Sequence, residues 1–404
     1  MMLERLWQEA EVALEPVLKE DRAREERVYG RLQEAFRLAG IHSSDLAPEP
    51  GYGFHPAGLT KLEAVYSHYF QAEAALVRPQ MVSGTHALSL ALEALVPAGG
   101  RLLVATGEPY DSLWPVLGLG DGHPGSLPSR HQVEVKVVTA GRGAEIRSVL
   151  SRYRPDVVLI QRSRGYSGAA SRPVQHLDEV SALAVTEGAL VIVDNCYGEF
   201  VEDREPLTGG GGLAVGSLIK NPGGTLAPTG AYVVGGKALV ERVAERLFGP
   251  ALGSAPGPVP DGIRPYVQGL YLAPHLVREA IGVSRRAAHL FRALGYDVDP
   301  EPAAERTDLV LRVRTGQAAR LSRAMAALQA QMALDAHLRP EPAAWPGYRH
   351  PVLMAGAVFV PGGTLELSAD APMRPPFDLF LQGGVSAAEA RGPILAMAEA
   401  MGPA

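Results

Sequence analysis

Cysteine is nearly absent from this sequence, which contains only Cys196 among its 404 residues. A single cysteine excludes a disulfide framework and a cysteine-based metal site, and the histidines do not show the spacing of metal ligands. No charged amino-terminal region followed by an apolar core opens the chain, and no apolar run approaches the roughly 18 to 20 residues of a membrane span. The formal net charge of −6 provides no basic field for nucleic acid or an anionic membrane. We therefore expect a cytoplasmic globular protein that binds neither.

Lysine is also scarce, since only five of the 38 basic residues are lysines. Lysine matters because it can condense with an aldehyde and then exchange that bond for a substrate amine. Lys19 and Lys61 lie in charged helical segments, and Lys136 alternates outward on a strand pattern. Lys237 follows a Gly-Gly pair at the start of a helical pattern. Only Lys220 has apolar residues before it and glycines after it, which makes it the candidate for covalent chemistry.

Lys220 lies where the apolar part of the segment VGSLIKNPGG ends and a glycine-rich loop begins. Upstream, the apolar run Val191-Ile-Val ends on Asp194. Pyridoxal 5′-phosphate (PLP) chemistry needs such a pair, because lysine bonds to the cofactor aldehyde and a carboxylate keeps the pyridine nitrogen protonated. In isolation, Asp194 is more commonly the N-cap of the following helix. Together, the two residues predict a PLP-dependent enzyme.

Apolar runs alternate with helical patterns through the first two thirds of the chain. Residues 1–40 carry apolar side chains at helical spacing, and Gly40 ends this helix. Strand patterns follow at residues 101–106, 133–139, 156–161, 189–194, 213–219 and 231–234, with helical patterns at 60–70, 81–96, 144–153 and 174–187. This alternation predicts an α/β fold with a mostly parallel sheet and helices on both faces.

A segment rich in Pro, Gly and Ala, residues 250–265, indicates a connection between two domains. Beyond it, we expect a long helix over 274–294, strands over 308–313, 351–360 and 364–368, and helices over 317–335 and 387–401. The predicted organisation is an N-terminal helical arm (1–50), a large cofactor-binding domain (51–265) and a smaller C-terminal α+β domain (266–404).

A phosphate site is predicted where Ser83-Gly-Thr85 enters a helix rich in Ala and Leu. Glycine lets the backbone approach an anion, and the first amide groups of a helix point toward it. Ser217 lies three residues before Lys220, so its hydroxyl can reach the same phosphate if the chain turns there. The alternative is a plain N-capped helix, and the tripeptide alone does not distinguish the two.

Two further residues are candidates for contacts with the cofactor or the substrate. Tyr110 follows a predicted strand, where an aromatic face can stack on a planar ring; the alternative is a half-buried loop tyrosine. Arg374 lies after a predicted strand of the second domain, where a guanidinium can hold a substrate carboxylate; the alternative is a solvated surface charge. Because ligands bind at the carboxyl ends of parallel strands, we expect Gly84, Tyr110, Asp194 and Lys220 to meet there.

The order of these residues resembles the fold-type I PLP-dependent enzymes of cysteine and methionine metabolism, the cystathionine and methionine γ-lyase group. The closest resemblance is to its branch of aluminium-resistance or methionine γ-lyase-like proteins. It rests on the segments Gly51-Tyr-Gly-Phe54, Ala74-Ala-Leu-Val-Arg-Pro-Gln80, Ser83-Gly-Thr-His-Ala87, Gln161-Arg-Ser-Arg-Gly-Tyr-Ser167, Val193-Asp-Asn-Cys-Tyr-Gly-Glu-Phe-Val-Glu202, Gly216-Ser-Leu-Ile-Lys-Asn-Pro-Gly-Gly224 and Glu366-Leu-Ser-Ala-Asp370.

The resemblance implies PLP bonded to Lys220, with Asp194 at the ring nitrogen and Tyr110 over the ring. The implied phosphate contacts are Ser83, Gly84, Thr85 and Ser217, with Tyr52 supplied by a neighbouring subunit. A site shared between subunits implies a homo-oligomer, at least a dimer and commonly a homotetramer. Arg374 would bind the carboxylate of an amino-acid substrate.

The chain departs from the pattern of that branch at two positions. Relatives carry Gly-Arg-Asp where this chain has Gly58-Leu-Thr60, so Leu59 cannot supply an arginine contact to a phosphate. Ile219 precedes the lysine where better-studied γ-lyases have a hydroxyl. The phosphate contacts are therefore expected to differ from the family pattern.

The function that we predict is a PLP-dependent carbon–sulfur lyase acting on a sulfur amino acid. Lys220 would remove the α-proton, Asp194 would stabilise charge on the pyridinium, and Tyr110 would donate a proton to the departing thiol. Transamination or side-chain cleavage is the nearest alternative, since one electron sink serves all of these reactions. A non-catalytic, stress-related protein on the same fold is the alternative from another class. A nucleotide-binding Rossmann protein is disfavoured because no G-x-G-x-x-G opens an early helix.

Overall fold

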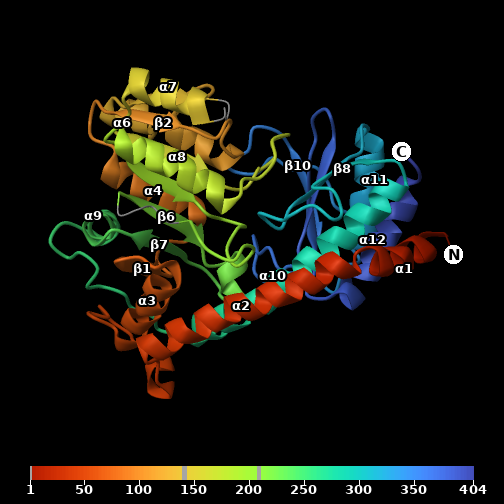
Figure 1. Ribbon diagram of the computed structural model, residues 1–404, viewed down its shortest axis with the longest axis horizontal. Coiled ribbons are helices and arrows are strands. Elements are labelled where there is room, and N and C mark those ends of the chain that lie inside the picture. The colour runs from red at the N-terminus through yellow and green to blue at the C-terminus, as the bar shows by residue number, and fades with distance from the viewer. Residues whose placement is uncertain (1, 139–142, 207–210) are drawn as a thin grey trace.

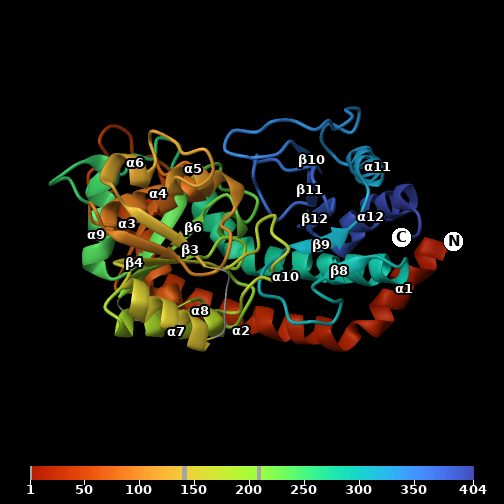
Figure 2. The same cartoon turned by 90° about the horizontal axis from the view of Figure 1, so that it is seen from above.

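The computed structural model describes residues 2–138, 143–206 and 211–404, which form two lobes (Figure 1). The chain begins with helices α1 (Met2–Ala13) and α2 (Glu15–Ala39), followed by a short 3-10 helix η1 (Ser43–Leu46). Leu18, Val28, Leu32 and Ala35 of α2 are buried at the spacing expected of one helix face. Both views show α1 and α2 passing from the small lobe to the large lobe (Figures 1 and 2). The predicted helix over 1–40 is confirmed, with a break at Leu14.

A seven-stranded sheet forms the large lobe. Its strands are β1 (Ala74–Arg78), β2 (Arg101–Val104), β3 (Glu134–Val137), β4 (Val157–Gln161), β5 (Leu190–Asp194), β6 (Gly212–Ser217) and β7 (Ala231–Gly235). Their order is β1-β7-β6-β5-β4-β2-β3, and the five strands from β6 to β3 are parallel. β7 is antiparallel to both β6 and β1. The prediction of a mostly parallel sheet is confirmed.

Helices cover both faces of this sheet. The helices of the lobe are α3 (Ala57–Phe70), α4 (Gly84–Leu95), α5 (Trp114–Leu117), α6 (Leu127–His131), α7 (Gly143–Tyr153), α8 (Val174–Thr186) and α9 (Lys237–Phe248), with 3-10 turns η2 (Asp111–Leu113) and η3 (Asn221–Gly223). Along β4, Val157 and Leu159 enter the core shared with α4 and α9, whereas Val158 and Ile160 enter the core shared with α3 and α8. This alternation explains why the central strands read as continuous apolar runs.

The small lobe contains a five-stranded antiparallel sheet in the order β10-β11-β12-β9-β8. Its elements are α10 (Arg264–Ala293), β8 (Asp297–Asp299), β9 (Leu311–Arg314), α11 (Ala318–Gln329), β10 (Val352–Gly356), β11 (Ser368–Pro372), β12 (Asp378–Gln382) and α12 (Ala387–Met401). Figure 2 shows α10 extending between the two lobes, with the N- and C-termini both at the far end of the small lobe. None of the helices in the described ranges is both long enough and apolar enough to cross a bilayer.

Several predicted boundaries in the second half are wrong. The long helix begins at Arg264, ten residues before the predicted start, because Pro265 occupies its first turn and Pro274 lies inside it. The predicted strand over 364–368 is displaced, since β11 begins at Ser368. β1, β8 and β12 were not predicted as strands. The domain limits at residues 50 and 265 remain predictions.

Candidate active site

The site lies where the carboxyl ends of β5 and β6 meet the first turn of α4. Ser83 caps α4, and its hydroxyl accepts a hydrogen bond from the amide of His86 at 3.1 Å. A Cβ added to Gly84 would lie 3.0 Å from the Sγ of Cys196 and 3.5 Å from the Cβ of Ser217. A methyl group at this position would press on Cys196, so glycine suits the close approach of α4 to both strand ends. The structure brings three predicted phosphate residues, Ser83, Gly84 and Ser217, to one place.

Asp194 is the last residue of β5 and is buried. Burial raises the pKa of its carboxyl group from an ordinary 3.8 to about 6, although the backbone amide of Cys196 donates to Oδ1 at 3.1 Å and the charge of Lys220 lowers this pKa. The helix-cap alternative is not the role that this residue takes, because no helix follows β5 directly. A buried carboxylate without a full set of donors is suited to pair with a cation of a ligand.

Lys220 follows β6 and is half-buried. Its Nζ donates a hydrogen bond to the hydroxyl of Tyr197 at 2.9 Å and lies 4.5 Å from the centroid of the same ring. Its charge lowers the pKa values of the carboxyl groups of both Asp194 and Asp370. The lysine amine therefore faces the same site as the predicted ring-nitrogen partner.

Tyr110 lies beyond the carboxyl end of β2, immediately before η2. Its hydroxyl shares a hydrogen bond with that of Thr85 at 3.1 Å, and Thr85 shares a second with Ser112 at 3.1 Å. The backbone amide of Tyr110 donates to Oε1 of Gln161 at 3.0 Å. Burial raises the pKa of Tyr110 well above its ordinary value, so its phenol keeps its proton. Tyr110 thus contacts the first turn of α4 through Thr85.

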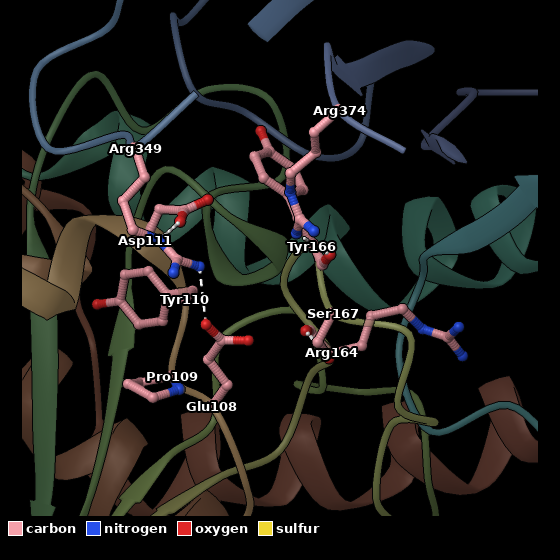
Figure 3. Close-up of a pocket in the computed structure, with 9 residues that line it drawn as sticks. All are labelled: Glu108, Pro109, Tyr110, Asp111, Arg164, Tyr166, Ser167, Arg349 and Arg374. Carbon is pink, nitrogen blue, oxygen red and sulfur yellow. Dashed lines mark hydrogen bonds and ion pairs between the residues drawn. The ribbon is translucent and has the colours of Figure 1, made fainter. Parts of the chain in front are cut away.

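A pocket opens beside Tyr110, between loops of the two lobes (Figure 3). From the small lobe, Arg374 donates to the backbone carbonyl of Tyr166 at 2.9 Å, and within the described ranges it forms no ion pair. Figure 3 shows its guanidinium directed into the pocket, whereas that of Arg164 points away toward its own partner, Asp299. Arg374 is therefore the arginine of this pocket with charge available for a ligand carboxylate.

Arg349 enters the same pocket from the loop before β10 but is already engaged. Its Nε contacts Asp111 at 2.8 Å, its Nη2 contacts Glu108 at 2.9 Å, and its guanidinium lies 3.6 Å from the ring centroid of Trp114. Sequence reasoning missed this residue, because no pattern distinguishes one arginine in an irregular segment of an arginine-rich chain.

The structure also places residues at the site to which the sequence assigned no role. These residues are Tyr166, Tyr197 and Asp370, and all three lie in segments that carry the family resemblance. Their place in those segments was the only feature of the sequence that could have indicated a role at the site. Asp370 is hydrogen-bonded to Tyr166, and burial raises the pKa of the Asp370 carboxyl group. The ring of Tyr348, from the small lobe, lies 5.8 Å from that of Tyr166.

The remaining predicted contacts lie outside this cluster. Tyr52 is on the exposed segment between η1 and α3, with 79% of its surface accessible and its ring stacked 5.3 Å from that of Phe54. Leu59 belongs to α3, and its side chain is buried in the hydrophobic core. At this position, where relatives carry arginine, the chain therefore has a core side chain. Ile219 lies close to Gly362, at the contact with the small lobe.

A parallel sheet that presents a lysine and an aspartate at adjacent strand ends, opposite a helix N-terminus, defines the class of fold-type I PLP-dependent enzymes. The chain belongs to the methionine gamma-lyase family, whose profile it matches over residues 3–402. It is 34% identical over 406 residues to the uncharacterised protein YnbB of Bacillus subtilis, covering 99% of this chain and 96% of that protein.

Solved structures give the same result. A carbon-sulfur lyase involved in aluminium resistance from Clostridium novyi is 32% identical, with a TM-score of 0.92 over 98% of this chain and 95% of that one. The PLP-dependent protein YhfS from Escherichia coli is 19% identical, with a TM-score of 0.63 over 95% of this chain and 97% of that one. The second likeness concerns the fold alone. The predictions of fold class and family are confirmed.

Proposed function

We propose that the protein is a PLP-dependent carbon–sulfur lyase that eliminates a thiol from a sulfur amino acid. Membership of the methionine gamma-lyase family supports a lyase of this kind. The observation that carries the proposal is the position of the Lys220 amine: Lys220 follows β6, the parallel neighbour of the strand β5 that ends on the buried Asp194, and its charge lowers the pKa of that carboxyl group. The identity of the sulfur amino acid is left to the assay below.

The residues of this site fit PLP. Because Gly84 lacks a Cβ, the first turn of α4 lies close to the end of β6. The amide groups of that turn suit a phosphate near Ser83, Thr85 and Ser217. Asp194 provides a buried carboxylate for the pyridine nitrogen, and Lys220 provides the amine for the aldehyde. When bound, PLP supplies an electron sink for the bond broken at the substrate Cα.

The protein side chains then perform the proton transfers. The amine of Lys220 takes the α-proton of the substrate, and Arg374 holds the substrate carboxylate. Burial raises the pKa of Tyr110, so its phenol is still protonated when the thiolate departs. Tyr110 is the proton donor that we assign to that thiolate. The Tyr110 hydroxyl is oriented by Thr85 at 3.1 Å.

The proposal includes a site completed by a second subunit. Tyr52 and Phe54 form an exposed, stacked aromatic pair, which a second chain would cover. In a dimer, Tyr52 would contact the cofactor phosphate of the partner. Light scattering is expected to give a dimer or tetramer, and Tyr52→Phe to weaken PLP binding; a monomer that binds PLP as tightly would contradict this.

The first test is covalent trapping. Purified protein mixed with PLP, reduced with borohydride and digested should yield one PLP-labelled peptide containing Lys220, because none of the other four lysines lies in this site. Lys220→Ala should lose both the label and the visible absorbance of bound cofactor. Label on another lysine, or none, would contradict the proposal.

The second test is turnover. Methionine, cystathionine and cysteine are each supplied to the PLP-loaded protein while keto acid and the released thiol (sulfide in the case of cysteine) are measured. Release of both products from at least one substrate is expected. Keto acid without thiol, accompanied by conversion of the cofactor to its amine form, would indicate transamination; no product from any substrate, despite bound PLP, would favour a non-catalytic protein.

A further inference from the structure

Tyr197 makes two contacts with a single atom of Lys220. Its hydroxyl oxygen lies 2.9 Å from Nζ, and the centroid of its ring lies 4.5 Å from the same nitrogen. A lysine side chain has four rotatable carbon–carbon bonds, and fixing them costs up to about 2 kcal/mol of conformational entropy. Two simultaneous contacts with one nitrogen select a single conformer of this flexible chain.

We propose that Tyr197 is a positioning residue that holds the amine of Lys220 in the conformation from which it bonds to the cofactor aldehyde. The inference rests on the proposed function, since it concerns the same lysine. It adds a residue that the reaction scheme above does not use, and a step, the capture of the cofactor, that can be followed without any substrate.

The turn that carries Tyr197 contains residues in an unfavourable backbone conformation and is stabilised by buried hydrogen bonds. Tyr197 has φ of 70° and Phe200 has φ of 65°, both in the left-handed region that side chains other than glycine rarely adopt. The side chain of Asn195 accepts from Arg162 at 2.7 Å and donates to Glu205 at 2.9 Å, and the amide of Phe200 donates to the same Glu205 at 2.8 Å. A buried polar network therefore fixes the turn at both ends and aims Tyr197 at the lysine.

The same turn is tied directly to the loop that carries Lys220. The side chain of Asn221, the next residue, is buried and donates to the backbone carbonyl of Glu199 at 3.0 Å. Its Oδ1 accepts from the hydroxyl of Thr364 in the small lobe at 3.1 Å. Because backbone segments on both sides of the Lys220–Tyr197 contact are joined, their separation is set by the fold rather than by the two side chains alone.

The hydroxyl of Tyr197 acts as a hydrogen-bond acceptor and not as a base. Burial, followed by the charges of Asp370 and other nearby acidic groups, raises the pKa of Tyr197 well above its ordinary value. The phenol therefore stays neutral, and its oxygen accepts the hydrogen bond from Nζ. Removing only the hydroxyl should disturb the orientation of Nζ while preserving the ring and its packing.

Tyr197→Phe tests this in the absence of substrate. The cofactor-free protein is mixed with PLP, and growth of the absorbance of the covalent product is followed by stopped flow. Loss of this hydrogen bond, which orients the reacting nitrogen, predicts a rate about tenfold slower. Affinity for 4′-deoxypyridoxine 5′-phosphate, which lacks the aldehyde, should stay within about twofold of wild type, because a positioning residue does not hold the rest of the cofactor.

Tyr153→Phe is a matched control. The Tyr153 ring lies 5.2 Å from the Nζ of Lys136, but its hydroxyl donates to the backbone carbonyl of Glu134, away from the site. This variant should match wild type in both measurements. Tyr197→His, which keeps a hydrogen-bonding group, should recover part of the rate and gives a second variant if the Phe substitution does not fold.

The outcomes separate this inference from the proposed function. Equal condensation rates in Tyr197→Phe and wild type would overturn the positioning role and leave the proposed function standing. Equal losses in condensation rate and in affinity for the aldehyde-free compound would show that Tyr197 has a structural role. That result would also overturn the positioning role. Failure of the wild-type protein to bond to PLP would overturn both.

Discussion

At the scale of single residues, the burial of the Asp194 carboxyl group opposes folding. Asp194 is taken out of water at the end of β5 with the backbone amide and the thiol of Cys196 as donors, and burial raises the pKa of its carboxyl group to about 6. Such a group is useful because a ligand cation can satisfy it, and it weakens the ligand-free protein for the same reason. Function and stability conflict at this position.

Asp194→Asn should therefore stabilise the cofactor-free protein. The ionised carboxylate opposes folding as pH rises from its unfolded value of 3.8 to about 6, and the pKa difference corresponds to about 3 kcal/mol above that range. Asparagine carries no charge and still accepts from the amide of Cys196. Urea unfolding should show no advantage of the variant at pH 4 and the full advantage at pH 7. A variant less stable than wild type at pH 7 would contradict this reading.

At the scale of elements, the loop after Lys220 is held by direct backbone contact with α10. A Cβ on Gly269 of α10 would lie 2.1 Å from the carbonyl oxygen of Gly223, and one on Gly224 would lie 2.1 Å from that of Gly269. Gly224 also has φ of 50°, so it needs glycine for its backbone as well. The helix that joins the lobes therefore supports the loop that presents the lysine.

Gly269→Ala and Gly30→Ala should have opposite effects. Both glycines lie inside helices, where alanine is more favourable by about 0.5 to 1 kcal/mol. At Gly30 of α2 a Cβ would meet nothing within 4 Å among the described residues, so we expect that gain in thermal stability. At Gly269 the methyl group must displace the Lys220 loop, so we expect a loss of about 2 kcal/mol or more and slower bonding to PLP. Stabilisation by both substitutions would refute the contact.

At the scale of the whole molecule, α2 and α10 run side by side and join the two lobes (Figures 1 and 2). Asp21 of α2 and Arg285 of α10 are both buried and form two contacts, at 2.7 and 3.1 Å. The remaining guanidinium nitrogen donates to the carbonyls of Pro302 and Ala304. Two helices distant in sequence are thus held in one register by this pair.

Asp21→Ala should destabilise the protein by about 3 kcal/mol, because it leaves the guanidinium of Arg285 buried without its counter-ion. Glu20→Ala, which removes the neighbouring but exposed contact with Arg27, should change stability by less than about 1 kcal/mol. Chemical denaturation of both variants checks the difference. Similar losses in the two variants would mean that the buried pair does not hold the helices.

The sequence by itself determined the two strands that present Asp194 and Lys220. The apolar runs predicted over 189–194 and 213–219 form β5 and β6, which end at Asp194 and Ser217, since strands buried on both faces need an uninterrupted apolar pattern. The scarcity of lysine identified Lys220, and the Ser-Gly-Thr segment located the first turn of α4. These features are local, so neighbouring residues are enough to reveal them.

Only the tertiary structure decided which distant residues meet these strand ends. The contacts of Arg349 with Glu108 and of Asn221 with Thr364 join segments far apart in the chain, and β1, β8 and β12 become strands by pairing with partners across the sheets. The left-handed backbone of Tyr197 likewise depends on a buried network drawn from several elements. Such positions are set by packing between segments, which a local pattern of residues does not encode.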